Sequence, residues 1–288
     1  MSIVMCKRKG LTSSQIIIFG FSGVILLGTI LLMLPVSSRE GLWTSFPDAL
    51  FTSTSAVCVT GLVVHDTAAY WSGFGQLVLM LLIQIGGMGV ITVAASFAMI
   101  SGRRISLMQR STMQEAIAAP NVGGIVQLTG FAVKVTLLIE LLGAAAMAPG
   151  FCREFGLRGL WMALFHSVSA FCNAGFDLMG TRGAFSSLTS YAEEPVVNVT
   201  IMLLIIVGGI CFLTWDDIRI NRFRLDKSRV QSKVIFCTRV VLLAVPAVYF
   251  FFVCNVGNGV CKVHSHVFFS CLVDAGYFCD CDKCLLIH

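Results

Sequence analysis

ALFTSTSAVCVTGL, residues 49–62, has a second copy 114 positions downstream, ALFHSVSAFCNAGF at residues 163–176. Eight of the fourteen positions are identical without a gap. In the first copy the shared residues are Ala49, Leu50, Phe51, Ser53, Ser55, Ala56, Cys58 and Gly61. Such agreement is hard to obtain by chance, so the two stretches predict a structural unit that occurs twice.

Each copy lies between apolar runs that are long enough to cross a bilayer, but it is itself too short. A spanning helix needs roughly 20 residues at ~1.5 Å per residue, so the copies must enter partway and turn back. Non-helical backbone at that depth needs protein or water around its carbonyls. Gly61 and Gly175 supply backbone freedom at the turn. The pattern therefore predicts a short helix followed by carbonyls that can face an axis, as in a cation filter.

The composition predicts an all-α polytopic membrane protein. Of its 288 residues, 57% are hydrophobic and 12% are charged, and the mean hydropathy is +0.87. The net charge of +5 comes from short loops between apolar runs, where basic residues set topology, so we expect no nucleic-acid partner. The first apolar run has no small-residue cleavage site after it, and we expect it to remain attached.

The predicted spans arrange the chain in repeating units of span, pore helix and span, as in potassium channels. MLLIQIGGMGVIT, residues 80–92, matches MLLIIVGGICFLT, residues 202–214, which makes two units complete. The five predicted spans are 15–34, 75–100, 125–148 (ended by Pro149), 196–213 and 234–253. The predicted divisions are 1–100 and 101–218 for the two units, 219–253 for a loop and the first span of a third, and 254–288 for a cysteine-rich tail.

Basic residues predict the orientation in the cell membrane. Twelve Lys and Arg lie in the N-terminus and in the loops 101–121 and 216–233, against four on the other side. The positive-inside rule then places the N-terminus in the cytoplasm and both re-entrant segments towards the outside.

These stretches resemble the Trk/Ktr/HKT family of potassium transporters, and most closely the membrane subunit of Ktr-type uptake systems. The motifs that carry the resemblance are FPDALFTSTSAVCVTGL, LFHSVSAFCNAGFD, the glycine pair of each second span, and GGICFLTWDDI. Together they cover roughly residues 10–253.

The resemblance implies a pore subunit that takes up potassium, with sodium as a candidate coupling ion and no bound cofactor. Family members place four filter strands around one pore, form homodimers and dock on a cytoplasmic nucleotide-binding ring. Two filter strands are expected here, composed of Val59, Thr60, Gly61 and Leu62 and of Asn173, Ala174, Gly175 and Phe176. Because the repeat pattern stops after about residue 253, we expect a truncated or frameshifted product.

Charged residues near the strands and inside the spans have open roles. Asp66 and Asp177 could concentrate cations at the outer mouth, although a solvated loop charge is an equal alternative. Lys134 and Glu140 lie within one span, where ionisable groups are costly. They are six residues apart, so a direct pair between them is not expected.

Other function classes are weaker. The spacing of Cys279, Cys281 and Cys284 lacks the paired CxxC pattern of a zinc site, so we predict no metal site. GFSG at residues 20–23 matches an intramembrane serine protease pattern, but Ser22 would need a histidine base, and His166 is expected near the opposite face. We predict that the chain is not an enzyme. A non-transporting fragment of a potassium transporter remains the main alternative.

Overall fold

The structure is a computed structural model of the chain in which all regular elements of the described part are helical. One isolated bridge joins Ser38 to Trp71. The described residues are 12–90, 92–95, 107–117, 124–180, 188, 191, 194–210, 212–221 and 230–256.

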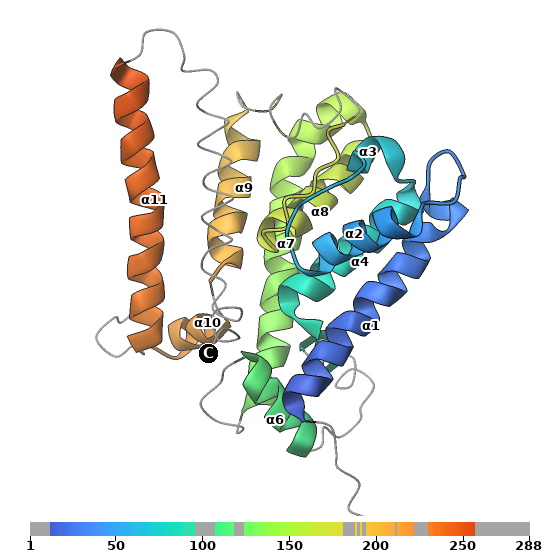
Figure 1. The fold of residues 1–288 in the computed structure, drawn as a ribbon. Coiled ribbons are helices and arrows are strands. Elements are labelled where there is room, and N and C mark those ends of the chain that lie inside the picture. Colours follow the sequence, from blue (N-terminus) through green and yellow to red (C-terminus); the bar gives the residue numbers. More distant parts are fainter. Residues whose placement is uncertain are drawn as a thin grey trace, which may run out of the picture.

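Five of the described helices run along the long direction of the molecule, and two shorter helices lie near its lower end in Figure 1. The five are α1 (Ser13–Met33), α4 (Gly73–Met88), α7 (Ile125–Phe155), α9 (Pro195–Gly208) and α11 (Val230–Val256). The two at the lower end are α6 (Leu107–Ile117) and α10 (Phe212–Asn221). The remaining elements are η1 (Pro35–Ser37), α2 (Phe46–Val57), α3 (Thr67–Tyr70) and α8 (Arg158–Phe171).

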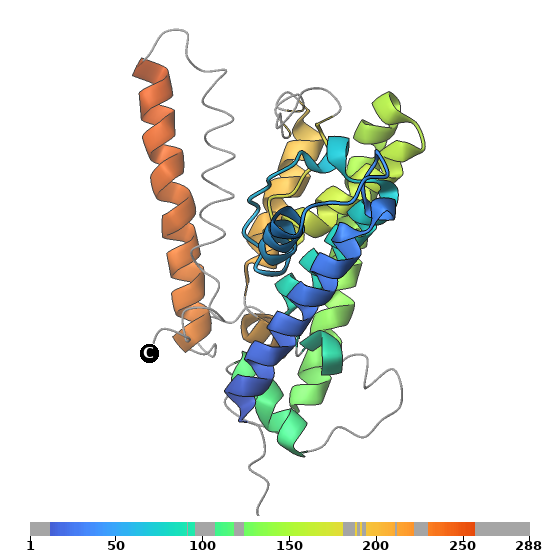
Figure 2. The same cartoon turned by 45° about the vertical axis from the view of Figure 1, so that its right-hand side comes forward.

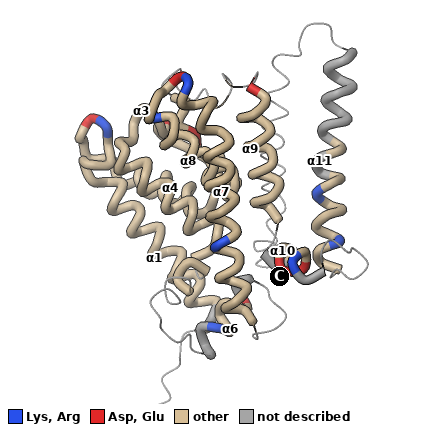
Figure 3. The backbone as a smooth tube through the Cα atoms, turned by 180° about the vertical axis from the view of Figure 1, so that it is seen from behind, with Lys and Arg blue, Asp and Glu red and all other residues tan. Residues whose placement is uncertain are grey.

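Two of the described helices are long and apolar enough to cross a membrane. They cover Ser14–Met33, with a hydropathy of 2.6, and Ile125–Phe155, with a hydropathy of 1.8. Figure 3 shows few charges along the middle of the helices and more at their ends. This distribution is typical of a membrane protein, since an ionised side chain within the bilayer is costly.

Helices α2 and α8 are the helical parts of the two sequence copies. With 12 and 14 residues they are about 18 and 21 Å long, short of the ~30 Å apolar core of a bilayer. Ser45 begins α2 by accepting a hydrogen bond from the Asp48 N–H through its side chain, and a proline follows in the first turn. Helix α2 packs on α1 and α4, whereas α8 packs on α7 and α9.

Matching contacts hold α2 and α8 in place. The Ser53 hydroxyl donates to the Ile25 carbonyl of α1 at 2.8 Å, and the Ser167 hydroxyl donates to the Glu140 carbonyl of α7 at 2.6 Å. A Cβ on Gly28 would lie 2.5 Å from the Ser53 Oγ. The glycines of α1 and α7 therefore admit the serine of the short helix that packs on each.

The glycine pairs of α4 and α9 also meet the short helices. A Cβ on Gly86 would lie 2.1 Å from the Val57 carbonyl oxygen, and one on Gly208 would overlap the Phe171 carbonyl oxygen. Each glycine therefore allows the C-terminal end of a short helix to approach a longer helix closely.

The helices differ from two of the predicted spans, one inside the span and one at its end. The helix of the predicted span 75–100 is interrupted at Gly89, whose φ is +81°, and helical residues resume beyond it. Helix α7 continues through Pro149 to Phe155, because a proline removes a single N–H donor and can remain inside a long helix at the cost of a kink. Gly156, with a φ of +58°, is the residue that ends α7. Of the predicted tail 254–288, residues 257–288 lie outside the described residues, and residues 254–256 belong to the end of α11.

Candidate ion-conduction site

The backbone after α2 and the backbone after α8 adopt the same unusual conformation. Val59 and Gly61 have φ values of 56° and 77°, and Asn173 and Gly175 have 56° and 73°. A left-handed residue reverses the turn of the chain, so left-handed residues in alternation with ordinary ones can turn successive carbonyls to one side. A β-branched residue such as Val59 rarely adopts a positive φ, and strain of this kind clusters at functional sites.

Amide groups of both loops point back into the short helices. The Thr60 N–H donates to the Ser55 carbonyl at 2.9 Å, and the Ala174 N–H donates to the Ser169 carbonyl at 2.8 Å. Within the described part of the chain, no hydrogen bond is accepted by the carbonyls of Thr60, Gly61, Ala174 or Gly175. The loops thus use their donors internally and leave these acceptors available to a cation.

The first loop, residues 58–66, is fastened at an exposed edge. His65 Nε2 lies 3.4 Å from Asp48 Oδ2 at the start of α2, and the His65 ring stacks on Tyr70 at 4.0 Å. The hydrogen bond from the Ser45 hydroxyl lowers the pKa of Asp48, and His65 acts in the same direction. Asp66 begins α3 by accepting hydrogen bonds from the Ala68 and Ala69 N–H groups at 2.9 and 2.8 Å.

The second loop, residues 172–180, is fastened from inside. His166 is 2% exposed, and its Nδ1 donates to the Met162 carbonyl at 2.7 Å. Its Nε2 accepts from the Leu178 N–H at 3.2 Å, which joins α8 to the loop that follows it. The Ser169 hydroxyl donates to the Phe176 carbonyl at 2.6 Å.

The two aspartates predicted near the strands have structural contacts as well as charge. Asp177 accepts a hydrogen bond from the Met179 N–H at 2.9 Å. Burial raises the pKa of Asp177, and the negative charge of Asp66 adds to this rise. Asp66 also contacts the second loop, because a Cβ on Gly180 would overlap its carboxylate oxygens.

The structure brings the two predicted strands to the same end of the molecule. Figures 1 and 2 both show the chain between α2 and α3 beside the chain that follows α8. Gly87 of α4 lies against the start of the second loop, since a Cβ there would lie 2.5 Å from the Cys172 Sγ. The eight predicted filter residues therefore belong to neighbouring loops rather than to separate parts of the molecule.

Sequence reasoning missed a buried polar contact between α4 and α7. The Gln84 amide donates to Glu140 Oε2 at 3.1 Å, and Glu140 is 2% exposed. Lys134 is exposed, so Gln84 rather than Lys134 is the partner of this carboxyl. The six-residue spacing within α7 argued against a pair between Lys134 and Glu140, but no local sequence pattern identified Gln84 as the partner of Glu140.

A second missed contact lies where α9 ends. Arg239 of α11 is 8% exposed and donates to the Gly209 carbonyl. A cation at the C-terminal end of a helix is favourable, because that end has partial negative charge. The sequence offered a signal here, since Arg239 is a charged residue inside a predicted span.

The protease alternative fails on geometry. Both ring nitrogens of His166 are used by backbone groups, whereas Ser22 is exposed on α1. His166 is therefore not placed to activate Ser22. Among the residues that the structure describes, no group of three or more His, Cys, Asp and Glu side chains could hold a metal ion. Cys279, Cys281 and Cys284 lie outside those residues.

Comparison with known proteins identifies the family. Residues 8–257 match the family model TrkH, which is described as a cation transport protein. The chain belongs to the TrkH family. This family description is that of a transport protein and not of a protease.

Three curated relatives of this TrkH-family chain are uptake proteins. The potassium/sodium uptake protein NtpJ of Enterococcus hirae is 40% identical over 237 residues, which are 82% of this chain and 51% of the relative. The Ktr system potassium uptake protein B of Bacillus subtilis is 38% identical over 257 residues, 89% of this chain and 56% of the relative. The protein of the same name from Vibrio alginolyticus is 37% identical over 246 residues, which are 85% of this chain and 52% of the relative. The chain therefore spans about half the length of these relatives.

Proposed function

We propose that this chain forms part of a potassium-uptake pore, in which the loops after α2 and α8 are two strands of a carbonyl-lined filter. Each of the two units of span, pore helix and span supplies one of these strands. The observation that carries the proposal is the shared backbone conformation at Val59–Gly61 and Asn173–Gly175, with carbonyls that the described residues leave unbonded.

The physical reason is the cost of removing water from potassium. Carbonyl oxygens held in place replace the hydration shell without large rearrangement. The C-terminal ends of α2 and α8 precede the two loops, and each end has the equivalent of about half a negative charge. Both helix ends therefore favour a cation at the loops.

Asp66 and Asp177 add charge beside the strands. The Asp66 charge acts on Asp177, and the Asp66 carboxylate lies against Gly180 of the second loop. A cluster of like charge at the mouth of a pathway raises the local concentration of counter-ions. We assign these two residues to cation attraction at the outer mouth, in addition to their hydrogen bonds.

The orientation and partners follow from the same proposal. The N-terminus and the basic loops 101–121 and 216–233 face the cytoplasm, and the filter loops face outside. The assembly is a homodimer whose basic loops contact a cytoplasmic nucleotide-binding ring, with sodium as a candidate coupling ion. The names of the relatives support the choice of potassium.

Uptake by cells tests the function. A bacterial strain that lacks potassium uptake is transformed with this chain, with its Gly175→Ser variant, or with an empty vector, and rubidium entry is measured. A chimera in which residues 8–253 replace the matching half of NtpJ is tested in parallel. The proposal predicts entry through the chimera and its loss in the Gly175→Ser chimera.

The alternative, a fragment that does not transport, predicts a different pattern. Uptake by the chimera without uptake by the 288-residue chain would favour the fragment. A Gly175→Ser chimera with unchanged uptake and unchanged potassium preference would contradict the filter assignment.

A further inference from the structure

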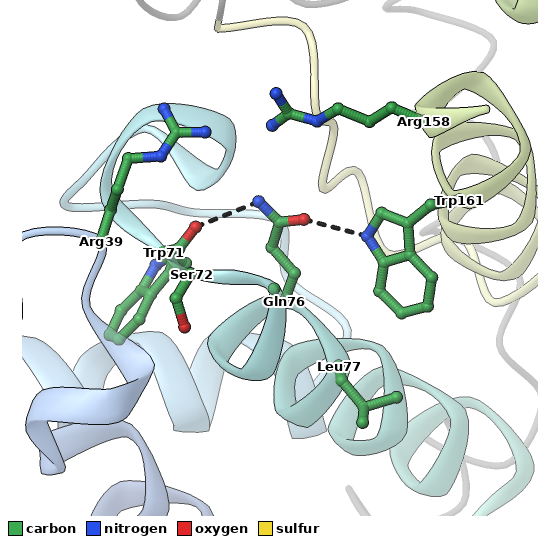
Figure 4. Close-up of a pocket in the computed structure, with 8 residues that line it drawn as sticks. Arg39, Trp71, Ser72, Gln76, Leu77, Arg158 and Trp161 are labelled. Carbon is green, nitrogen blue, oxygen red and sulfur yellow. Dashed lines mark hydrogen bonds between the residues drawn. The ribbon is translucent and has the colours of Figure 1, made fainter. Parts of the chain in front are cut away.

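A pocket of about 520 Å³ lies between the start of α4 and the start of α8. Arg39, Trp71, Gln76, Leu77, Arg158 and Trp161 contribute to its lining. Figure 4 shows that these side chains come from three parts of the chain, namely the loop after α1, the Trp71–Leu77 segment and α8. The pocket thus lies between the two units and apart from the filter loops.

The open side of the pocket is positively charged. In Figure 4 the guanidinium groups of Arg39 and Arg158 lie on the same side of Gln76. Neither arginine forms an ion pair with a residue that the structure describes, and no acidic side chain is among the described residues of the lining. The Arg39 N–H donates to the Tyr70 carbonyl at 2.9 Å, which fixes the backbone from which one charge extends.

Two hydrogen bonds hold the amide at the floor of the pocket. Gln76 is 4% exposed, and its Nε2 donates to the Trp71 carbonyl at 3.1 Å. Its Oε1 accepts from the Trp161 indole N–H at 2.9 Å. The Leu77 side chain and the Trp161 ring add apolar surface to the lining beside this amide.

The pocket is at the level where the apolar helices end. Arg39 follows α1, and Arg158 is the first residue of α8 after the end of α7. Large apolar side chains are exposed nearby in the sequence, with Trp43 at 70% and Leu157 at 87%. Tryptophan and arginine concentrate at the membrane–water interface, where a side chain meets water and lipid together.

We propose that this pocket binds the headgroup of an anionic phospholipid. The phosphodiester lies between the two guanidinium groups, which are well suited to phosphate oxygens, and the acyl chains run along Leu77 and Trp161. A zwitterionic lipid fits less well, because its ammonium group would meet two cations. Free phosphate would satisfy the arginines but leave the apolar part of the lining exposed to water.

A lipid in this position connects the two units. Arg39 and Gln76 belong to the first unit, whereas Arg158 and Trp161 belong to the second. The Gln76–Trp161 hydrogen bond already crosses this junction, and the lipid adds a contact from each arginine. Anionic phospholipid therefore stabilises the packing of α4 against α8.

Thermal unfolding of the purified protein in detergent tests the site. The melting temperature is measured with phosphatidylglycerol, phosphatidylcholine or inorganic phosphate added. We expect phosphatidylglycerol alone to raise it in a saturable way. In the Arg39→Gln/Arg158→Gln variant the apparent affinity should fall about 30-fold, since each basic residue near the surface contributes roughly five-fold.

Arg153→Gln is the matched control, because Arg153 is an exposed arginine in the last turn of α7 and does not line the pocket. This variant should bind phosphatidylglycerol like the wild type. Arg158→Lys keeps the charge and tests the site if the double variant does not fold. Equal stabilisation by phosphatidylcholine, stabilisation by inorganic phosphate, or an equal loss in Arg153→Gln would overturn the proposal.

Discussion

The loop after α2 and the loop after α8 have the same backbone conformation, but different side-chain contacts hold them in place. Both contain two left-handed residues and the same amide hydrogen bonds to the preceding helix. The first is tied at an exposed edge by His65 and Asp48, and the second by His166 in the interior. The backbone geometry is thus common to both copies, while the side chains that secure it differ. This is the expected pattern if the carbonyls, and not the side chains, perform the function.

The largest expected loss of stability tests the close helix packing that the two copies share. Gly86→Ala and Gly208→Ala each place a Cβ against the backbone carbonyl that ends a short helix, at Val57 and Phe171. Because backbone cannot move aside as a side chain can, each variant should lose about 3 kcal/mol of stability. Thermal unfolding in detergent measures this loss.

Gly23→Ala is the control for the glycine substitutions, because a Cβ on Gly23 would come within 4 Å of no atom in the rest of the described structure, apart from the backbone of its own helix. Alanine is a better helix former than glycine, so this variant should be as stable as the wild type or more stable. Tolerance of alanine at both Gly86 and Gly208 would show that the short helices do not pack as described.

The next prediction compares the stability that His166 gives to the second loop with the stability that His65 gives to the first. His166→Ala removes a buried ring and leaves the Leu178 N–H without its acceptor, which should cost about 3 kcal/mol. His65→Ala removes a partly exposed ion pair and should cost less than about 1 kcal/mol. Unfolding of the two variants side by side measures the difference. Equal losses would remove the distinction between the loops.

A smaller effect concerns the matching serines of the two short helices. The Ser169 hydroxyl donates to the Phe176 carbonyl, so Ser169→Ala should cost about 1 kcal/mol. Ser55 occupies the same position in the first copy, but its buried hydroxyl has no hydrogen-bond partner among the described residues, so Ser55→Ala should be close to neutral. A reversed order in thermal unfolding would contradict the hydrogen bonding of the second loop.

The smallest effect is a difference in pH dependence. The lowered pKa of Asp48 contributes stability above the ordinary aspartate pKa of about 4, and this is lost as pH falls through the lower folded value. The raised pKa of Asp177 acts oppositely, because the fold is favoured below about pH 4 and loses stability as pH rises through the higher folded value.

Asparagine variants measure that pH dependence. At neutral pH Asp48→Asn should lower the melting temperature, whereas Asp177→Asn should raise it slightly and keep the Met179 hydrogen bond. Both differences from the wild type should shrink in acid. A fall in the melting temperature of Asp177→Asn at neutral pH would mean that its charge supports the fold.

The sequence was sufficient to predict what the two copies share. The short helices, their position between longer helices and the backbone freedom needed at Gly61 and Gly175 all follow from the duplication and from the length of the apolar runs. The left-handed Val59 could not be predicted, because β-branched residues rarely adopt positive φ, whereas asparagine, as at position 173, does so more readily.

What differs between the copies could not be predicted, because it depends on contacts between distant residues. The partner of Glu140 is Gln84 on another helix, and Arg39 and Arg158 share a pocket although they are 119 residues apart. Pro149 favoured a helix end locally, but the packing of α7 against α8 accommodates a longer helix. Tertiary contacts outweighed the local signal.

Anomalous diffraction from crystals that contain rubidium tests the central claim most directly. The account predicts a rubidium peak at the loops, in contact with the backbone carbonyl oxygens of Gly61 and Gly175. A peak bound only by the carboxylates of Asp66 and Asp177, or crystals with well-ordered loops and no ion beside their carbonyls, would contradict it.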